Sequence, residues 1–215
     1  MDSLVTAAIA VRDNTSVCFM HVNYGQRTED MELISFKQLC EHYHPEKKLI
    51  IDMQWLKHVG GSALTDSNLL IKDHDGEEGV PITYVPYRNA NIVSAAVSWA
   101  EVILANRIYI GAVEEDSSGY PDCRETFFQN LQLAINTGTK DSTNIELVTP
   151  VIHMKKADIV KLGISLKAPF QYSWSCYKNS QEACGVCDSC YLRLKAFREA
   201  GVADPISYQK DVSHE

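Results

Sequence analysis

The chain has 215 residues, of which 45% are hydrophobic and 22% charged, and its 20 Lys+Arg against 28 Asp+Glu give a formal charge of −8. A chain of this length and composition buries enough apolar surface to fold as a globular domain without disulfides. No run reaches the roughly 20 apolar residues of a membrane span, and the start lacks the basic residues of a secretory signal. The acidic balance argues against a broad nucleic-acid-binding surface. We therefore expect a protein of the reducing cytoplasm with no membrane or nucleic-acid partner.

The first half of the sequence predicts helices and strands in alternation. An apolar stretch over residues 4–11 is compatible with a helix, and residues 16–22 are short, β-branched and bounded by polar residues, as buried strands are. Apolar residues recur at helical spacing over residues 28–43, and a second strand is expected over residues 48–53. Residues 60–81 are polar and acidic, which predicts a mobile loop.

The second half continues the alternation. We expect helices over residues 91–105, 125–137 and 155–162, the last one stopped by Gly163, and strands over residues 107–112 and 145–148. Short apolar strands that alternate with helices predict an α/β fold in which a parallel sheet is covered by helices on both faces.

A cluster of cysteines predicts a metal site near the C-terminus. Four of the seven cysteines are Cys176, Cys184, Cys187 and Cys190, so that a single cysteine precedes two consecutive C-x-x-C steps. Four thiolates complete a tetrahedral zinc site, which is then structural because no position is left open. An iron–sulfur cluster is a less favoured alternative, since its fourth cysteine would stand downstream before a proline. A disulfide pair or a chance cluster is disfavoured in an intracellular chain.

The zinc site would attach residues 174–190 to a helix that begins near Tyr191. We expect Arg193 and Lys195 to offset the excess thiolate charge. The other cysteines receive different interpretations: Cys18 and Cys40 lie at core positions of a strand and a helix.

Three polar loops follow or precede the predicted strands and helices, at residues 23–27, 85–89 and 114–124. In an open parallel sheet, ligands bind beyond the carboxyl ends of the strands, so these loops are candidate binding segments. Arg27 is equally compatible with a plain surface cation, and Arg88 with a helix start. In the third loop, Cys123 is better explained by packing than by nucleophilic catalysis, because the sequence shows no paired base.

The order of these motifs resembles a known family. The motifs are Tyr24-Gly25-Gln26-Arg27, Arg88-Asn89, Ser118-Gly119-Tyr120-Pro121-Asp122-Cys123-Arg124, Ser175-Cys176-Tyr177 and Cys184-Gly-x-Cys187-x-x-Cys190-x-Leu192-Arg193. They stand in the order found in the 7-cyano-7-deazaguanine synthases of the PP-loop (N-type ATP pyrophosphatase) superfamily. The resemblance covers nearly the whole chain.

The resemblance implies a Rossmann-like adenine nucleotide α-hydrolase fold, with an ATP-binding domain over residues 1–170 and a four-cysteine zinc segment with a helix over residues 171–215. It also implies a homodimer with one structural zinc per chain. The implied enzyme is an ATP-dependent ligase that converts 7-carboxy-7-deazaguanine and ammonia to 7-cyano-7-deazaguanine for queuosine biosynthesis, through an adenylated carboxylate.

Two positions depart from the family pattern. Tyr87 stands where many members have glycine before Arg-Asn. The family opens with a strand and the phosphate-binding Ser-Gly-Gly-x-Asp-Ser, of which only the last three positions are present, as Met1-Asp2-Ser3. We expect a strand and a phosphate loop of roughly ten residues upstream of Met1, by the usual length of a strand and a turn.

The resemblance also implies site residues. Lys156 would stabilise the departing pyrophosphate, and Asp2 and Ser3 would help to hold Mg²⁺ or phosphate. The residues expected to bind ATP are Met1, Asp2, Ser3, Leu4, Val5, Thr6, Gly25, Gln26, Arg27 and Gly111. The expected deazaguanine pocket comprises Arg88, Asn89, Glu114, Asp116, Ser118, Tyr120, Asp122 and Arg124. Glu114 or Asp122 suits the guanine-like edge, and Arg88 or Arg124 the substrate carboxylate.

Two other functions remain open from the sequence. A PP-loop enzyme that modifies tRNA also combines ATP with cysteines, although the acidic charge and the loop at residues 118–124 argue against it. Without the glycines of the phosphate loop, the chain is alternatively a catalytically silent ligand-binding or interaction protein.

Overall fold

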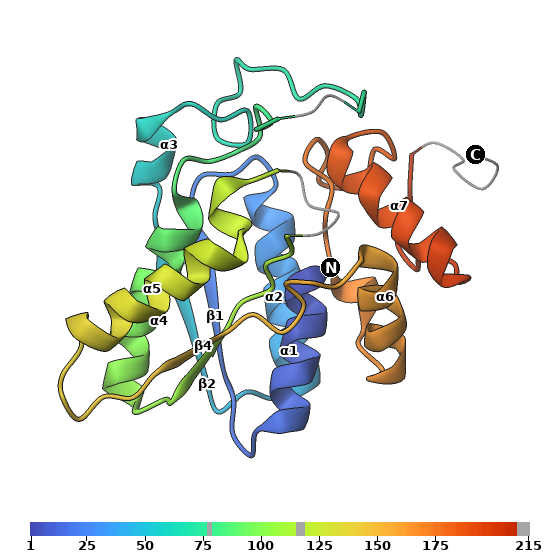
Figure 1. Ribbon diagram of the computed structural model, residues 1–215. Helices are drawn as coiled ribbons and strands as arrows, with labels where there is room; N and C mark the ends of the chain where they lie inside the picture. The colour runs from blue at the N-terminus through green and yellow to red at the C-terminus, as the bar shows by residue number, and fades with distance from the viewer. Residues whose placement is uncertain (77–78, 115–118, 210–215) are drawn as a thin grey trace.

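A computed structural model describes residues 1–76, 79–114 and 119–209 (Figure 1). Its helices are α1 (Asp2–Asp13), α2 (Glu29–Tyr43), α3 (Trp55–Val59), α4 (Arg88–Ile103), α5 (Glu125–Gly138), α6 (Lys156–Ser165) and α7 (Asp188–Ala200), with short 3-10 turns η1 (Pro121–Cys123) and η2 (Phe170–Tyr172). Its strands are β1 (Cys18–Asn23), β2 (Lys47–Asp52), β3 (Arg107–Tyr109) and β4 (Glu146–Val148).

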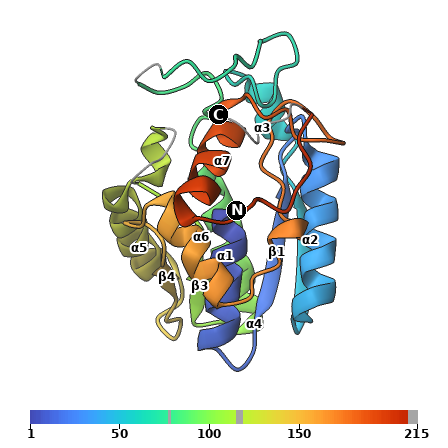
Figure 2. The ribbon, with the colours of Figure 1, turned by 90° about the vertical axis from the view of Figure 1, so that its right-hand side faces the viewer.

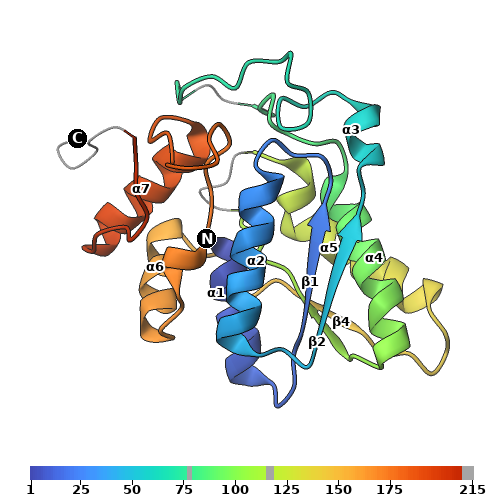
Figure 3. The same cartoon turned by 180° about the vertical axis from the view of Figure 1, so that it is seen from behind.

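The α/β class is confirmed, because helices alternate with parallel strands. β1 pairs with β2 in parallel, and β3 pairs with β4 in parallel. Helices α1 and α2 lie on one side of the strands and α4 and α5 on the other (Figures 1 and 3). The four described strands form two separate two-stranded sheets, whereas one continuous sheet was expected.

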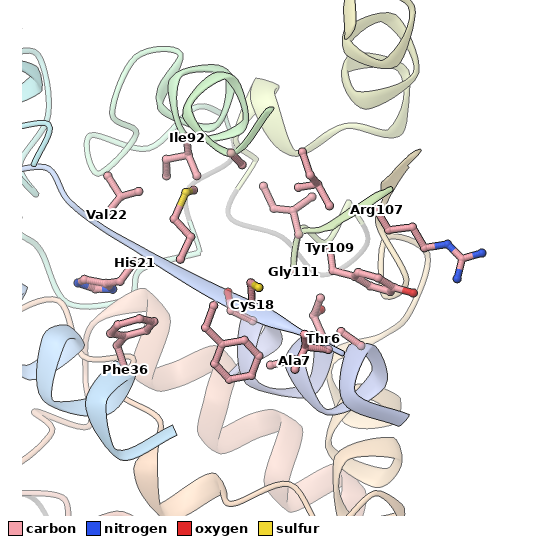
Figure 4. A pocket seen from close by; sticks show the side chains of 18 of the residues that line it. Thr6, Ala7, Cys18, His21, Val22, Phe36, Ile92, Arg107, Tyr109 and Gly111 are labelled. Atoms are coloured by element: carbon pink, nitrogen blue, oxygen red, sulfur yellow. The ribbon is translucent and has the colours of Figure 1, made fainter. Parts of the chain in front are cut away.

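A groove of about 1070 Å³ lies between the two sheets. Its walls come from β1, α1, α4 and the segment that begins with β3, as the positions of Cys18, Ala7, Ile92 and Tyr109 show in Figure 4. Central strands of a parallel sheet are normally buried on both faces. Here most residues of β1 are only half-buried, because the groove opens along its edge.

Helices α1, α6 and α7 form a packed group beside the strands (Figure 2). Val5, Ile159 and Val160 are fully buried in the core cluster that they share. The expectation that Gly163 ends a helix is wrong, since α6 continues to Ser165. A Cβ at Gly163 would lie 2.4 Å from the Phe170 ring and 2.8 Å from Val5, so glycine is required there for close packing.

Other differences from the expected elements are small. α3 is a single short helix at the carboxyl end of β2, and five residues are too few to show an apolar period. β3 ends at Tyr109 rather than at residue 112, and α7 begins at Asp188 rather than near Tyr191. Within the described residues, no helix has the length and apolar character to cross a bilayer.

Candidate active site and metal centre

The N-terminus of α1 lies against the segment that follows β3. A Cβ at Gly111 would lie 2.6 Å from the backbone nitrogen of Ser3 and 2.8 Å from the carbonyl carbon of Asp2, so only glycine allows this approach. The amides of Leu4 and Val5 donate to the Met1 carbonyl. The amides of Asp2 and Ser3 precede these bonds, as the first N–H groups of every helix do, and a helix N-terminus of this kind favours anions.

Four other residues expected to bind ATP lie in or next to the first turns of α1 and differ in how exposed they are. Leu4 and Val5 are core residues, 2% and 0% exposed, and Leu4 also lines the groove between the sheets. Thr6 is also buried, and its hydroxyl has no hydrogen-bond partner among the described residues. Met1 is partly buried and lines the cavity described below.

Asp2 and Lys156 form an ion pair across the start of α1 and the start of α6. Lys156 Nζ lies 3.0 Å from Asp2 Oδ2, with 14% and 24% of the two side chains exposed. Burial acts to raise the pKa of Asp2, but the charge and hydrogen bond of Lys156 oppose it, and the pKa is lowered overall. The other oxygen, Asp2 Oδ1, is buried without a partner in the described part of the chain. This free carboxylate oxygen fits a Mg²⁺ ligand, because Mg²⁺ prefers carboxylate oxygens.

A cavity of about 170 Å³ adjoins this pair. It gathers residues from six places in the sequence: the start of α1, the start of α4, the segment after β3, the region of η1, the start of α6, and the cysteine-rich segment with α7. The lining residues are Met1, Asp2, Arg88, Gly111, Ala112, Val113, Tyr120, Cys123, Lys156, Ser175, Tyr177, Ser189, Leu192 and Arg193. Met1, Arg88 and Gly111 also line the groove between the sheets, so the two spaces adjoin.

Arg88 is the principal cation of this cavity besides Lys156. Its Nη1 donates to the Tyr24 hydroxyl at 3.2 Å and its guanidinium lies 5.4 Å from the centre of that ring. Within the described residues its side-chain partners are the neutral oxygens of Tyr24 and Asn89, and its Nε is buried without a partner. Glu32 lies nearby, but it is held by Gln26 and Thr28 and burial raises its pKa. A buried cation without a carboxylate partner is suited to an anionic ligand.

Asn89 and Asp122 hold two loops together rather than lining the cavity. The amide of Asn89 donates to Asp122 Oδ2, and Asn89 Nδ2 donates to the Asp122 carbonyl, both at 2.9 Å. Asn89 Nδ2 also lies 3.3 Å from Cys123 Sγ. These bonds connect the start of α4 to η1, so the two residues position Arg88 and Cys123.

The remaining residues of the expected substrate pocket are dispersed. Tyr120 is buried against the cavity, and its hydroxyl donates to Thr83 Oγ1 at 2.9 Å. Glu114 Oε2 accepts the amide of Glu125 at 2.8 Å, at the start of α5, and Arg124 is exposed. Neither lines the cavity. Asp116 and Ser118 lie outside the described residues.

The segment Gly25-Gln26-Arg27 supports the fold rather than the cavity. Gly25 has φ +79°, and a Cβ there would lie 2.8 Å from Lys57. Gln26 accepts the amide of Tyr24, and Arg27 donates to the carbonyls of Asp66 and Leu69. None of the three lines the cavity beside Asp2.

Cys123 reaches the cavity as a protonated thiol. Burial, followed by the charge of Asp122, raises its pKa to about 11. A thiol with such a pKa is a poor nucleophile at neutral pH. This agrees with the packing role preferred from the sequence.

The four cysteines of the C-terminal segment converge. Their sulfur atoms all lie within 4.8 Å of one another and all four residues are buried. Cys184 Sγ and Cys190 Sγ are 3.9 Å apart, close to the about 3.8 Å between sulfurs of a tetrahedral site with Zn–S bonds of about 2.3 Å. Bonds from Cys187 and Cys190, and backbone amides, lower the pKa of Cys176. The donor set therefore fits a closed zinc site.

The cysteine-rich segment does more than attach itself to α7. Ser175, Tyr177, Ser189, Leu192 and Arg193 form one wall of the cavity. Arg193 is 1% exposed, its Nε lies 2.6 Å from Asp204 Oδ2, and its Nη1 donates to Ser173 Oγ. Its charge is therefore paired with Asp204 and does not offset the thiolate charge, although that role had been expected. Lys195 Nζ lies 3.9 Å from Glu199 Oε1 on the exposed face of α7. The contribution of Tyr177 was missed, because a tyrosine between cysteines carries no signal of its own.

The structure combines a parallel α/β fold with a four-cysteine centre and with a helix N-terminus beside an ion pair. The family model described as queuosine biosynthesis protein QueC matches residues 1–201. The chain belongs to this family.

Curated relatives point to one enzyme within it. The chain is 56% identical over 210 residues to the 7-cyano-7-deazaguanine synthase of Chlorobaculum parvum, covering 97% of the chain and 92% of the relative. The 7-cyano-7-deazaguanine synthase of Chlorobium chlorochromatii gives the same values. That of Chloroherpeton thalassium is 54% identical over 212 residues, covering 97% and 93%.

Proposed function

We propose that the chain is a 7-cyano-7-deazaguanine synthase, an ATP-dependent ligase that makes this nitrile from 7-carboxy-7-deazaguanine and ammonia for queuosine biosynthesis. The observation that carries the proposal is the identity of 56% to a curated synthase over 97% of the chain. The cavity supports it, because Arg88, whose Nε has no partner among the described residues, lines it together with the Asp2–Lys156 pair. The enzyme would act as a homodimer.

The chemistry requires activation, because a carboxylate is a poor electrophile toward ammonia. The carboxylate oxygen attacks the α-phosphorus of ATP and releases pyrophosphate, which leaves an acyl-adenylate. Ammonia displaces AMP to give the amide. A second adenylation, on the amide oxygen, followed by loss of AMP and two protons, leaves the nitrile.

The chain's own residues bind and orient the reactants. Arg88 holds the substrate carboxylate, and Tyr120 and Tyr177 form the surface against which the planar ring packs. Lys156 stabilises negative charge on the leaving pyrophosphate, together with the amides of Asp2 and Ser3. Asp2 Oδ1 would hold Mg²⁺, which supplies further charge stabilisation when bound.

The groove between β1 and β3 completes the nucleotide site in this proposal. A parallel strand in the groove would join the two sheets into one, and its carboxyl end would lie where α1 begins. The strand, α1 and β1 then form a right-handed crossover unit, and the order in which successive strands are added to the sheet reverses between the strand and β3. Ligands of open α/β sheets bind at that reversal, which is the position of the cavity.

Product analysis with ¹⁵N-ammonia tests the function. We expect 7-cyano-7-deazaguanine labelled in the nitrile, with AMP formed only when ATP, ammonia and 7-carboxy-7-deazaguanine are all present. The matched control is 7-deazaguanine, which lacks the carboxylate and should release no AMP. Labelled product without ATP, or AMP release that is indifferent to the carboxylate, would refute this function.

A further inference from the structure

The connection between α3 and α4, described over residues 60–76 and 79–87, is packed firmly at its beginning. Ser62 and Ala63 are 0% exposed, and Leu64 is 4% exposed. Arg27 donates to the carbonyls of Asp66 and Leu69. This first part of the connection is therefore fixed to the side of the molecule that holds β1 and α2, although a mobile loop was expected.

The middle of the connection reaches the zinc segment through His74. The amide of His74 donates to the Val186 carbonyl at 2.8 Å, and its ring Nδ1 lies 2.8 Å from Asp188 Oδ1. The ring also stacks on Tyr191, with 3.8 Å between centroids and 14° between planes. A carboxylate oxygen only accepts, so Nδ1 carries a proton.

These three partners of His74 flank the zinc ligands. Val186 lies between Cys184 and Cys187, and Asp188 follows Cys187 at the start of α7. The backbone of such a ligand loop is ordered by its metal. Contacts to Val186 and Asp188 therefore require the folded zinc loop.

The end of the connection forms part of the cavity. Thr83 Oγ1 accepts the hydroxyl of Tyr120, which lines the cavity, and Arg88 follows the connection at the start of α4. From the opposite side, the hydroxyl of Tyr177 lies 3.5 Å from that of Tyr120. The connection thus contacts the zinc segment at His74 and through the Asp73–Lys178 ion pair, and it reaches the same segment at the cavity through Tyr120.

We propose that His74 is a positioning residue that transmits the folding of the zinc segment to the substrate cavity. It holds the α3–α4 connection against the zinc loop, so that Thr83, Tyr120 and Arg88 keep their places. Its effect on kinetics rests on the proposed function, whereas its effect on the connection does not.

His74→Ala and His74→Asn test this proposal, with His58→Ala as the matched control on an exposed histidine of α3. Hydrogen exchange is measured over residues 66–76 in zinc-loaded protein. We expect faster exchange for His74→Ala, at an unchanged zinc content, and partial recovery for His74→Asn, whose amide can donate to Asp188. His58→Ala should exchange like the unsubstituted chain. Chelating the zinc should accelerate the same amides in the unsubstituted chain and add little in His74→Ala.

Kinetics give the second measurement. KM for 7-carboxy-7-deazaguanine should rise several-fold in His74→Ala while kcat stays within twofold. Unchanged exchange over residues 66–76, or an equal acceleration throughout the protein, overturns the proposal. If exchange changes as expected but a chain that carries a strand and Ser-Gly-Gly before Met1 makes no nitrile, the coupling stands and the proposed function fails.

Discussion

Seven buried side-chain polar atoms lack partners within the described residues, and two of them are Asp2 Oδ1 and Arg88 Nε. A buried polar group left unsatisfied costs about 1–3 kcal/mol, and more when it is charged. Both residues line the same cavity. A ligand that brings a cation to Asp2 and a carboxylate or phosphate to Arg88 would remove this cost, as ATP with Mg²⁺ and a carboxylated base would.

Lys156→Ala should abolish most of the activity without unfolding the chain. Its ammonium is the positioned cation nearest Asp2, and removal of one such electrostatic group reduces kcat by about 10²–10³-fold. The measurement is AMP release, with thermal unfolding as a check on the fold. Lys155→Ala is the control, since Lys155 is exposed. Normal AMP release by Lys156→Ala would exclude the assigned role.

Arg88→Gln and Arg124→Gln distinguish the two cations proposed for the substrate carboxylate. Arg88 lines the cavity and Arg124 is exposed away from it. We expect KM for 7-carboxy-7-deazaguanine to rise by about tenfold or more in Arg88→Gln, in line with the about 1.5–3 kcal/mol of a charge-assisted bond, and to change little in Arg124→Gln. The reverse order would transfer the role to Arg124.

The Asp2–Lys156 pair predicts a pH dependence of stability. Because the pKa of Asp2 is lowered in the folded chain, its contribution is present above the unfolded pKa of about 3.9 and is lost as pH falls through the folded pKa. The free energy of unfolding at pH 7 should therefore be higher for the unsubstituted chain than for Asp2→Asn. This difference should shrink toward pH 3. A difference that grows with acid would contradict the lowered pKa.

Long, periodic elements could be predicted from the sequence, and features set by contacts could not. α2 and α4 show apolar residues at helical spacing, so they were expected within a few residues of their bounds. Gly163 was misread because its role is set by Phe170 and Val5, which pack on it from other parts of the chain. Division into two sheets was missed, since alternation of elements does not indicate which strands pair.

Substitution of Gly163 tests the packing of α6 against its neighbours. A Cβ at residue 163 would lie 2.4 Å from the Phe170 ring, so the ring or the helix would have to move. Overpacking of this kind typically lowers the free energy of unfolding by about 1–3 kcal/mol. Urea denaturation should show a loss of about this size in Gly163→Ala. Gly138→Ala is the matched control at the end of α5, where a Cβ meets nothing within 4 Å, and should be neutral or stabilising by about 0.5–1 kcal/mol. Equal effects of the two substitutions would disprove the packing argument.

The cysteine segment was the most predictable part of the site. Its spacing alone indicated four sulfur ligands, and the four sulfur atoms do converge. Its second role, as a wall of the cavity, could not be predicted because it depends on how the segment packs against α1 and α4.

Cys187→Ser should remove zinc and unfold the C-terminal segment. Structural zinc stabilises its ligand loop directly, so loss of one thiolate releases the metal. Elemental analysis should give one zinc for the unsubstituted chain and for the control Cys18→Ser, and far less for Cys187→Ser, with protease cleavage confined to the residues after 170. Iron in place of zinc, or a folded segment without metal, would be inconsistent with this assignment.

At the scale of the whole molecule, the site is assembled from segments far apart in the sequence. The motifs indicated which residues belong together, but not that Asn89 and Asp122 face each other rather than the cavity. The groove between β1 and β3 has a volume of about 1070 Å³, and Met1 and Ser3 at the start of α1 line it. We therefore expect nucleotide binding to depend on a strand that fills the groove and joins the two sheets.

AMP release by a chain extended before Met1 tests whether a strand in the groove completes an ATP-binding site. The extension is an apolar six-residue strand followed by Ser-Gly-Gly, and its control carries two prolines in the strand, which cannot complete the backbone hydrogen bonds of a central strand. With 7-carboxy-7-deazaguanine, ammonia and ATP, we predict AMP and nitrile from the extended chain at well above the rate of the proline control. If the extended chain releases no AMP, the chain is not a synthase of this kind.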